Sequence, residues 1–373
     1  MKALSAKRPR LTRWLSLLLS ASTISALIIL PTEFSHATVV SCTPTKNLVL
    51  LLDARNTRSN TGSGSTWKDI SGCGLDATLN NGPTRTTDQG GAFQFSRNSQ
   101  QWAQTNSPGD LKPYTVEAYY KVDNFNSRAC TAIVSDSYDS IVINKINFTI
   151  GTFDNGDYLY GAAGPWTYTN HPSSTFGSDL TGWHIATLTY DNTNMQLYFD
   201  SATVGSAVSF SSSNMGSNGT GINIAKRWDN ASNCTQTNYD NYFGGRIALV
   251  KILNKALTAT EVQDEYRCIT GGSTPTITMD SPGTNPKKQS LNQTITATSN
   301  CTGSVNFYYG ARAIKGCTGV ANVLSGSKYV ATCNWKPIIH GQNSVTATIS
   351  FNYYPDNQSS TTNITVLKRT TSR

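Results

Sequence analysis

Charge is scarce in this sequence. Asp, Glu, Lys and Arg make up 14% of its 373 residues, against about a quarter in an average soluble domain. Long salt-bridged helices and coiled coils need more charge, so the composition disfavours both. Ser, Thr, Asn and Gly take the place of the missing charges, which suits β-structure exposed to solvent. The hydrophobic share of 38% is sufficient for a core, so the composition also argues against wholesale disorder.

Several catalytic motifs are missing as well. The chain has four histidines and neither an HExxH nor a CxxC spacing, which disfavours a zinc enzyme. It has no GxxxxGK[ST] loop, which excludes a P-loop nucleotide enzyme. After residue 30 no apolar run is long enough to cross a bilayer.

The N-terminus reads as a targeting segment. Five basic residues precede an apolar run over residues 15–30, and Ser35-His36-Ala37 then offers small residues to a signal peptidase. We therefore predict a signal peptide over residues 1–37 and a secreted, extracellular protein, with association at the cell surface left open. An uncleaved membrane anchor is the alternative, but the run is shorter than the roughly 20 residues that span a bilayer.

All eight cysteines follow residue 37, and their number is even. In an exported protein this pattern predicts disulfides, whereas free buried thiols are the alternative. The number alone does not give the connectivity. The cysteines are Cys42, Cys73, Cys130, Cys234, Cys268, Cys301, Cys317 and Cys333.

Charge divides the rest of the chain into two regions. Residues 38–271 carry a net charge of −3, and residues 272–373 carry +7. The boundary coincides with the Gly-Gly-Ser-Thr-Pro stretch that ends at Pro275, a typical linker composition. We predict one domain over 38–270, a linker over 271–275 and a second domain over 276–373.

Apolar and polar residues alternate with period 2 in both regions, as in residues 114–122, 195–199 and 345–351. Many short strands separated by turn residues predict an all-β fold. One short helix of about two turns is expected after Thr258, because Thr258 and Glu261 have the spacing of a capping box.

Motifs spread in order over residues 44–268 resemble a known family. They include NLVLLLDA at 47–54, GSGSTWKDISG at 62–72, GWHIATLTYD at 182–191 and FGGRIALVKI at 243–252. Together they are similar to a laminin-G-like domain of the concanavalin A-like jelly-roll class. The resemblance implies two antiparallel sheets with the first and last strands close together.

The second region resembles a bacterial Ig-like repeat. The resemblance rests on GSVNFYY at 303–309, IKGC at 314–317, ATC at 331–333 and the strand pattern at 345–349. It implies a Greek-key sandwich that serves as a spacer or adhesive unit. The expected fold is therefore all-β, a jelly-roll β-sandwich followed by a smaller Ig-like Greek-key β-sandwich.

The two resemblances also imply disulfide pairs. Jelly-roll termini meet, so Cys42 is expected to pair with Cys268. Cys317 and Cys333 flank adjoining strands of the Ig-like module and form the second pair. The other four cysteines give a third pair, Cys130 with Cys234, and two without an obvious local partner, Cys73 and Cys301.

We expect no cofactor. Calcium is the one cofactor to weigh, and two departures from the family pattern disfavour it. The chain reads FSRNSQ at 95–100 and SGCG at 71–74 where relatives carry more oxygen donors, and a calcium site needs six to eight oxygens. Asp154-Asn155-Gly156-Asp157 is expected to be a tight hairpin, because two carboxylates make an incomplete shell.

No catalytic residues are predicted. Glycosidases need two carboxylates about 5–10 Å apart, and the Glu-x-Asp-x-x-Glu strand pattern of glucanases in this class is absent. Only three glutamates follow residue 37. Glu117 is expected to be an isolated surface carboxylate, and Glu261 and Glu265 to lie on a solvated helix face. A Ser-His-Asp site lacks its Gly-x-Ser-x-Gly elbow. The protein is therefore expected not to be an enzyme.

Carbohydrate binding requires aromatic platforms and polar groups on loops or an open sheet face. Loops at 164–171, 227–230 and 239–242 carry such groups, although rings of this kind also pack at sandwich ends. The candidate ligand-binding residues are Trp166, Tyr168, Trp228, Asp229 and Tyr239. Three further tryptophans adjoin expected core strands and are predicted to pack there: Trp67, Trp102 and Trp183.

The sequence thus favours a secreted, non-enzymatic binding or adhesion protein that recognises carbohydrate. Its expected partners are glycans or cell-envelope polymers, not nucleic acid, and it would have no membrane span after cleavage. The alternatives are a glycan-degrading enzyme with an unrecognised site and a purely structural surface protein. The net positive charge of residues 272–373 suggests attachment to an anionic envelope, with a solvated basic surface as the alternative.

Overall fold

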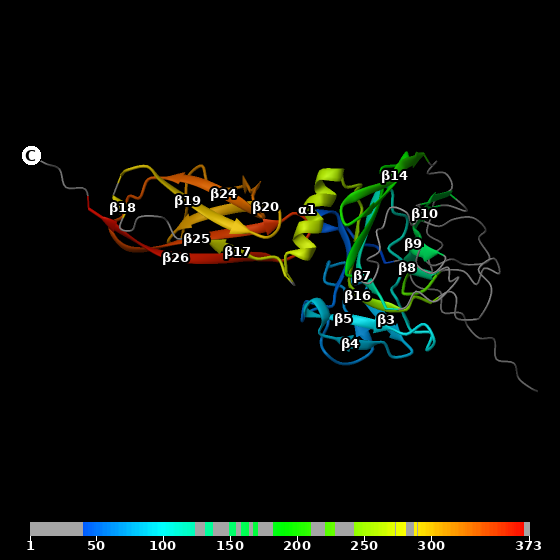
Figure 1. Ribbon diagram of the computed structural model, residues 1–373. Coiled ribbons are helices and arrows are strands. Elements are labelled where there is room, and N and C mark those ends of the chain that lie inside the picture. Colours follow the sequence, from blue (N-terminus) through cyan, green and yellow to red (C-terminus); the bar gives the residue numbers. More distant parts are fainter. Residues whose placement is uncertain are drawn as a thin grey trace, which may run out of the picture. The chain divides into compact units, whose positions relative to one another are not determined.

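The computed structural model describes residues 40–123, 131–136, 149–153, 158–163, 167–170, 182–209, 221–227, 242–272, 274–280, 287–288 and 290–368. The expected signal peptide lies outside these ranges. The described residues are mostly β, with one α-helix and two short 3-10 turns, Thr45–Asn47 and Asp88–Gly90 (Figure 1). They belong to one compact unit.

Two large antiparallel sheets build the first region. One contains eight strands, and β1 and β7 both pair with β16 in it. Its spatial order is β14 (Ala202–Ser209), β13 (Asn194–Phe199), β12 (His184–Tyr190), β7 (Tyr114–Val122), β16 (Gly245–Leu253), β5 (Ala92–Phe95) and β4 (Thr84–Thr86), with β1 (Leu48–Asp53) beside β16. Because β1 and β16 are the first and last strands of this region, their pairing confirms that its ends meet.

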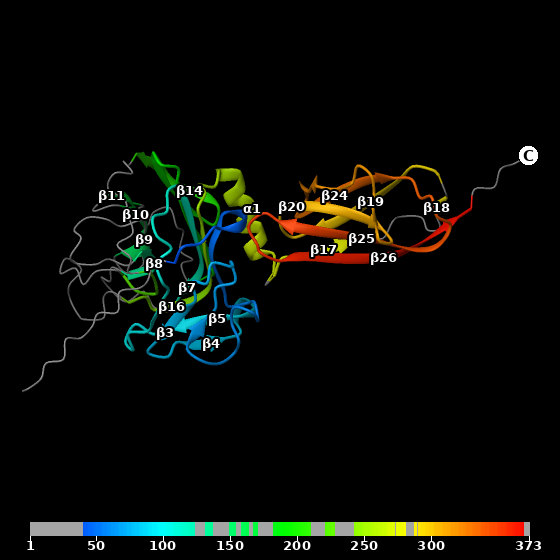
Figure 2. The same ribbon diagram turned by 180° about the vertical axis from the view of Figure 1, so that it is seen from behind.

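The second sheet also has eight strands, several of which are visible in Figure 2. Its order is β11 (Thr167–Asn170), β10 (Tyr158–Ala163), β9 (Thr149–Phe153), β8 (Thr131–Asp136), β15 (Ile222–Ile224), β6 (Trp102–Gln104), β3 (Ala77–Asn80) and β2 (Thr66–Trp67). The inner side chains of both sheets form one apolar core, which includes Trp67, Phe93 and Val116. This two-sheet arrangement confirms the predicted jelly-roll sandwich.

The C-terminal region is a smaller pair of sheets with four and six strands. The four-stranded sheet runs β17 (Ile277–Met279), β19 (Gln293–Ser299), β24 (Lys328–Trp335) and β23 (Val323–Ser325). The other runs β18 (Lys287–Lys288), β26 (Asn357–Leu367), β25 (Gly341–Phe351), β20 (Gly303–Tyr309) and β21 (Arg312–Ala313), with β22 (Val320–Ala321) on β20. Buried and less buried residues alternate along β20 and β24, as the sequence pattern requires. The Ig-like identity of this region stays a prediction.

The α-helix, α1, spans Ala259–Thr270. Thr258 and Glu261 form the predicted capping box, in which each side chain bonds to the other residue's backbone N–H. The helix runs longer than the expected two turns because its last turn buries Cys268 and Ile269. These residues and Val262 join an apolar cluster with Leu249 of the first sheet, so α1 packs on the outer face of that sheet.

Three disulfides are present among the described residues. Cys317 pairs with Cys333, as predicted, with Cα atoms 5.5 Å apart. The expected Cys42–Cys268 pair is wrong. The structure joins Cys42 to Cys73 and Cys268 to Cys301, with Cα separations of 5.3 and 4.6 Å, and Cys130 and Cys234 lie outside the described residues.

The mispairing has a local cause. The ends of the jelly roll do meet, but α1 follows β16 and carries Cys268 to the C-terminal region. Cys42 instead lies beside the loop before β3, which is held against β1. There, the carboxylate of Asp69 accepts hydrogen bonds from the backbone N–H groups of Leu51 and Ser71. Cys73 is therefore close to the chain that leads into β1.

The carboxylate of Glu261 generates a pH-dependent prediction. It accepts hydrogen bonds from Lys255, Tyr353 and the N–H of Thr258. Burial raises its pKa, but these bonds outweigh burial and lower the pKa to about 2, from an ordinary 4.5. The stabilisation is therefore complete above pH 4.5 and is lost as the pH falls towards 2.

Glu261→Gln keeps a capping side chain but removes the charge. At pH 7 we expect the variant to lose about 1 kcal/mol of unfolding free energy. Denaturant unfolding of both proteins between pH 7 and pH 2 should show this difference shrinking below pH 4.5. A difference that is constant over the whole range would contradict the assignment.

Candidate functional site

The sequence-predicted ligand residues lie mostly beyond the described parts of the chain. Trp166, Trp228, Asp229 and Tyr239 are outside them, and Tyr168 is placed only as a backbone position in β11. Trp228, Asp229 and Tyr239 lie between Lys226 and Tyr242 in the sequence, and these two described residues form a β-bridge.

A row of polar side chains crosses the second sheet on the face away from the core. Gln104 of β6 lies opposite Thr78 of β3 and Asn223 of β15, and Asn223 lies opposite Ser135 of β8. Residues directly opposite each other in a sheet point to the same face. Ala103, next to Gln104, points into the core instead. We call Thr78, Gln104, Asn223 and Ser135 the polar row.

Asn223 is the most informative member of this row. Its side chain is only 4% exposed, and its Oδ1 atom is buried without a hydrogen-bond partner. A buried acceptor that lacks a partner costs about 1–3 kcal/mol. Gly221 fixes this position: its φ is +91°, and an added Cβ would lie 1.9 Å from the carbonyl oxygen of Thr105. The backbone thus holds the unpaired Asn223 oxygen on the side of the second sheet away from the core.

An aromatic–lysine cluster lies beside the row. It consists of Trp102, Lys226 and Tyr242, each partly exposed. The Lys226 ammonium lies 4.0 Å from the Trp102 ring centroid and 5.7 Å from that of Tyr242. Ser135 of the row donates a hydrogen bond to the carbonyl oxygen of Lys226. Partial burial lowers the pKa of Lys226, and the cation–π contacts offset part of that desolvation.

The three tryptophans expected in the core differ in how deeply they are buried. Trp67 is fully buried against Phe93, as predicted. Trp183 is partly buried and packs on Tyr119. Trp102 was placed wrongly, because it lies on the outer face of β6. The signal was present in the sequence: Trp102 and Gln104 flank Ala103, so strand alternation puts both on the face opposite the apolar residue.

The glutamates lie in different surroundings from those expected. Glu117 and Glu265 are buried, not solvated, and both contact the buried Lys251 ammonium. The Glu117 carboxylate lies 3.2 Å from Lys251 Nζ. Burial raises the pKa of Glu117 to about 7, although the attraction of Lys251 lowers it. These groups are buried where α1 meets the first sheet, on the opposite side of the sandwich from the polar row.

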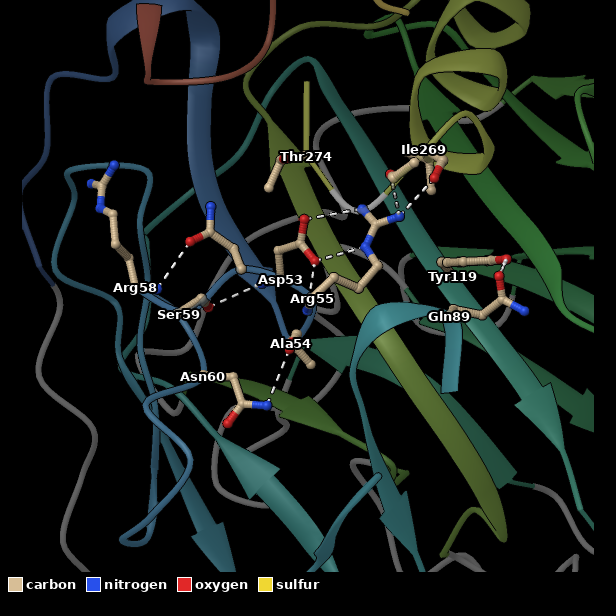
Figure 3. Close-up of polar contacts among 12 residues, drawn as sticks. Asp53, Ala54, Arg55, Arg58, Ser59, Asn60, Gln89, Tyr119, Ile269 and Thr274 are labelled. Atoms are coloured by element: carbon tan, nitrogen blue, oxygen red, sulfur yellow. Dashed lines mark hydrogen bonds and ion pairs between the residues drawn. The ribbon is translucent and has the colours of Figure 1, made fainter. Parts of the chain in front are cut away.

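A second buried ion pair joins Asp53 and Arg55 (Figure 3). The Arg55 guanidinium binds both carboxylate oxygens of Asp53 and donates a hydrogen bond of 2.6 Å to the carbonyl oxygen of Ile269. Ile269 lies in the last turn of α1, where carbonyl groups lack helical partners. This pair thus caps the helix, and its charged atoms are engaged within the fold.

Two absences concern only the described part of the chain. Within it, no three His, Cys, Asp or Glu residues are grouped so that they could hold a metal ion. No described helix is both long and apolar enough to cross a membrane.

The outer face of the second sheet therefore has the chemistry of a polar ligand site. It carries a buried, unpaired carbonyl acceptor at Asn223, and beside it an amide at Gln104, an ammonium donor at Lys226 and partly exposed aromatic rings at Trp102 and Tyr242. Such groups recognise a hydroxyl-rich ligand through hydrogen bonds and apolar contacts.

The buried glutamates generate a stability prediction. Lys251→Met would leave Glu117 and Glu265 buried together without a cation, so we expect a loss of about 3–5 kcal/mol in denaturant unfolding. Adding Glu117→Gln and Glu265→Gln should recover more than half of that loss. Lys68→Met, which removes an exposed pair with Asp76, is the matched control and should change stability by less than about 1 kcal/mol. A small effect of Lys251→Met would contradict the assignment.

Comparison with known proteins finds a family match for part of this chain. Residues 87–263 match a family model described as the concanavalin A-like lectin/glucanases superfamily. This stretch is a concanavalin A-like lectin/glucanase domain, in agreement with the resemblance seen in the sequence. The C-terminal β region lies outside the match. No curated protein matches the chain in sequence.

Several solved structures are similar. Domain 4 of AbnA, an extracellular arabinanase from Geobacillus stearothermophilus in complex with arabinotriose, shares 16% identity at a TM-score of 0.41, over 58% of this chain and 97% of that chain. Trypanosoma rangeli sialidase in complex with sialic acid shares 15% sequence identity at a TM-score of 0.45. The match covers 62% of this chain and 36% of that chain. The binding domain of Paraclostridial Mosquitocidal Protein 1 shares 13% sequence identity at a TM-score of 0.45. The match covers 82% of this chain and 76% of that chain.

Proposed function

We propose that this chain is a secreted or cell-surface protein that binds glycans on the outer face of its second sheet without cleaving them. The observation that carries the proposal is Asn223, a buried carbonyl acceptor without a partner beside Trp102, Lys226 and Tyr242. The family of residues 87–263, which includes lectins, supports the same ligand class.

The ligand chemistry follows from the side chains. A sugar ring has hydroxyl groups around its edge and C–H groups on its faces. The Asn223 oxygen can accept a bond from one hydroxyl, and the Lys226 ammonium can donate to another. The partly exposed rings of Trp102 and Tyr242 can pack against a C–H face. Few such contacts give modest affinity for one sugar, so tight attachment would rely on several copies binding together.

The ligand residues predicted from the sequence are proposed to contribute to the same glycan binding. Trp228, Asp229 and Tyr239 lie in the sequence between Lys226 and Tyr242, the two residues that form a β-bridge beside the polar row. Tyr168 belongs to β11, the edge strand of the same sheet. Trp166 and Tyr168 are proposed to bind further units of a longer glycan.

Binding without cleavage is favoured by how the glutamates are used. A glycosidase needs a proton donor and a base or nucleophile on either side of the bond. The three glutamates after residue 37 have structural partners: Glu117 and Glu265 hold Lys251, and Glu261 caps α1. The alternative, a glycan-cleaving enzyme, predicts reducing-sugar release by the same preparation.

Export is the other part of the proposal. Disulfides persist in oxidising compartments, and three of them among the described residues are consistent with a secreted protein. The predicted signal over residues 1–37 agrees with this location.

Asn223→Leu tests the binding face. Because the Asn223 oxygen has no partner, replacing the amide should leave the melting temperature unchanged or higher. Glycan affinity, measured by calorimetry on hits from a glycan array, should fall on the order of tenfold. Asn254→Leu is the matched control, since Asn254 also buries an unpaired Oδ1 but lies at the end of β16. Equal effects of both variants on binding, an array without hits, or reducing-sugar release would refute the proposal.

Trp166→Ala combined with Trp228→Ala tests the ligand residues predicted from the sequence. We expect this double variant to abolish glycan binding while the melting temperature falls by no more than a few degrees. A large loss of thermal stability would instead mean that these rings belong to the core, and their assignment to glycan binding would fail.

A further inference from the structure

The C-terminal region contains a cleft of its own. It has a volume of about 520 Å³, within the range of small-ligand sites. Its walls are the segment 312–315, which begins with β21, and the segment 334–339, which begins at the end of β24. Because β20 and β24 belong to different sheets, the cleft opens where the two sheets of this region end.

The cleft is held in shape by local contacts. The Tyr309 and Trp335 rings pack 4.8 Å apart at its base and are both buried. Tyr309 donates a hydrogen bond of 2.7 Å to the carbonyl oxygen of Ile339, which fixes the second wall. The Cys317–Cys333 disulfide ties the first wall to β24. A ligand would therefore meet a preformed site and would not have to order it.

The charge of the cleft has one sign. Arg312, Lys315 and Lys336 line it and are exposed, and none of its lining residues is acidic. Only two acids occur in residues 272–373, and both are engaged elsewhere. Asp280 accepts a hydrogen bond from Thr298, and Asp356 pairs with Arg58 of the first region. Three cationic residues thus line one cleft, and no acidic residue lines it with them.

Polar and apolar groups accompany these cations. Ile338 is 63% exposed and Ile339 47% exposed at the cleft. Asn292 and Asn334 add amides. We propose that this cleft binds an acidic polysaccharide, with carboxylate groups at Arg312, Lys315 and Lys336 and sugar C–H faces against Ile338.

Nucleic acid fits the cleft less well. Proteins that bind single strands stack bases on exposed aromatic rings. Here the two rings of the cleft, Tyr309 and Trp335, are only 7% and 6% exposed. Charge attraction with apolar and amide contacts, but without a stacking platform, favours a sugar polymer.

The cleft lies in a different region from the outer face of the second sheet and would take a ligand of different charge. The two can fail separately. Cleft variants should leave binding of a neutral glycan to the second sheet unchanged, and Asn223→Leu should leave binding at the cleft unchanged.

The test compares two variants that lose the same charge. One carries Arg312→Gln and Lys336→Gln in the cleft, and the other carries Lys328→Gln and Lys368→Gln on exposed positions outside its lining. Affinity of the chain from residue 38 for polygalacturonate oligomers is measured by calorimetry, with neutral dextran as the negative control. We expect the cleft variant to bind on the order of tenfold more weakly and the control variant to change less than about twofold.

Each outcome decides the proposal. Lys315→Gln alone should weaken binding in the same direction, and unchanged melting temperatures show that the variants fold. Equal weakening by the two charge-matched variants would assign binding to the general charge of the region and overturn the cleft. Absence of polygalacturonate binding would overturn it as well. Tighter binding of single-stranded DNA of equal charge would overturn the polysaccharide as ligand.

Discussion

Helix α1 is the element on which both β-regions depend. Its buried Glu265 contacts Lys251 of the first sheet, and its Cys268 is bonded to Cys301 of the C-terminal region. The carboxylate of Glu261, in the first turn of α1, accepts a hydrogen bond from Tyr353. Burial of a charged pair is costly unless its geometry is well satisfied, so this ion pair constrains how α1 packs on the sheet. The disulfide then ties the C-terminal region to the same helix.

This placement of α1 decides which surface is left for a ligand. The helix covers the outer face of the first sheet, where Tyr119, Ile185 and Leu249 join its apolar cluster. The outer face of the second sheet instead carries the polar row, with Asn223 at its centre. The outer face of the first sheet is therefore covered by α1, which is bonded to the C-terminal region. The outer face of the second sheet carries hydrogen-bonding groups.

Strand periodicity was enough to predict the sandwich. The segment Tyr114–Val122 forms β7 as expected, but both of its faces are buried, because α1 covers the side that carries Glu117. A period-2 pattern cannot reveal such a cover, since it depends on an element over 130 residues away. The predicted Cys42–Cys268 pair failed because α1 carries Cys268 to Cys301 of the C-terminal region, while Cys42 pairs with Cys73. Trp102 could have been placed correctly from the sequence. It alternates with the apolar Ala103 and shares the polar face of the strand with Gln104.

The two proposed sites differ in the interaction that would give each its affinity. On the second sheet, binding would rest on directional hydrogen bonds to groups such as Asn223, which salt affects little. In the cleft, binding would rest on three exposed cations, whose attraction is screened over about 8 Å at physiological salt. A polymer with both neutral and acidic sugars could engage both sites at once. Two modest affinities on one chain would then multiply into stable attachment, provided that the polymer can reach both.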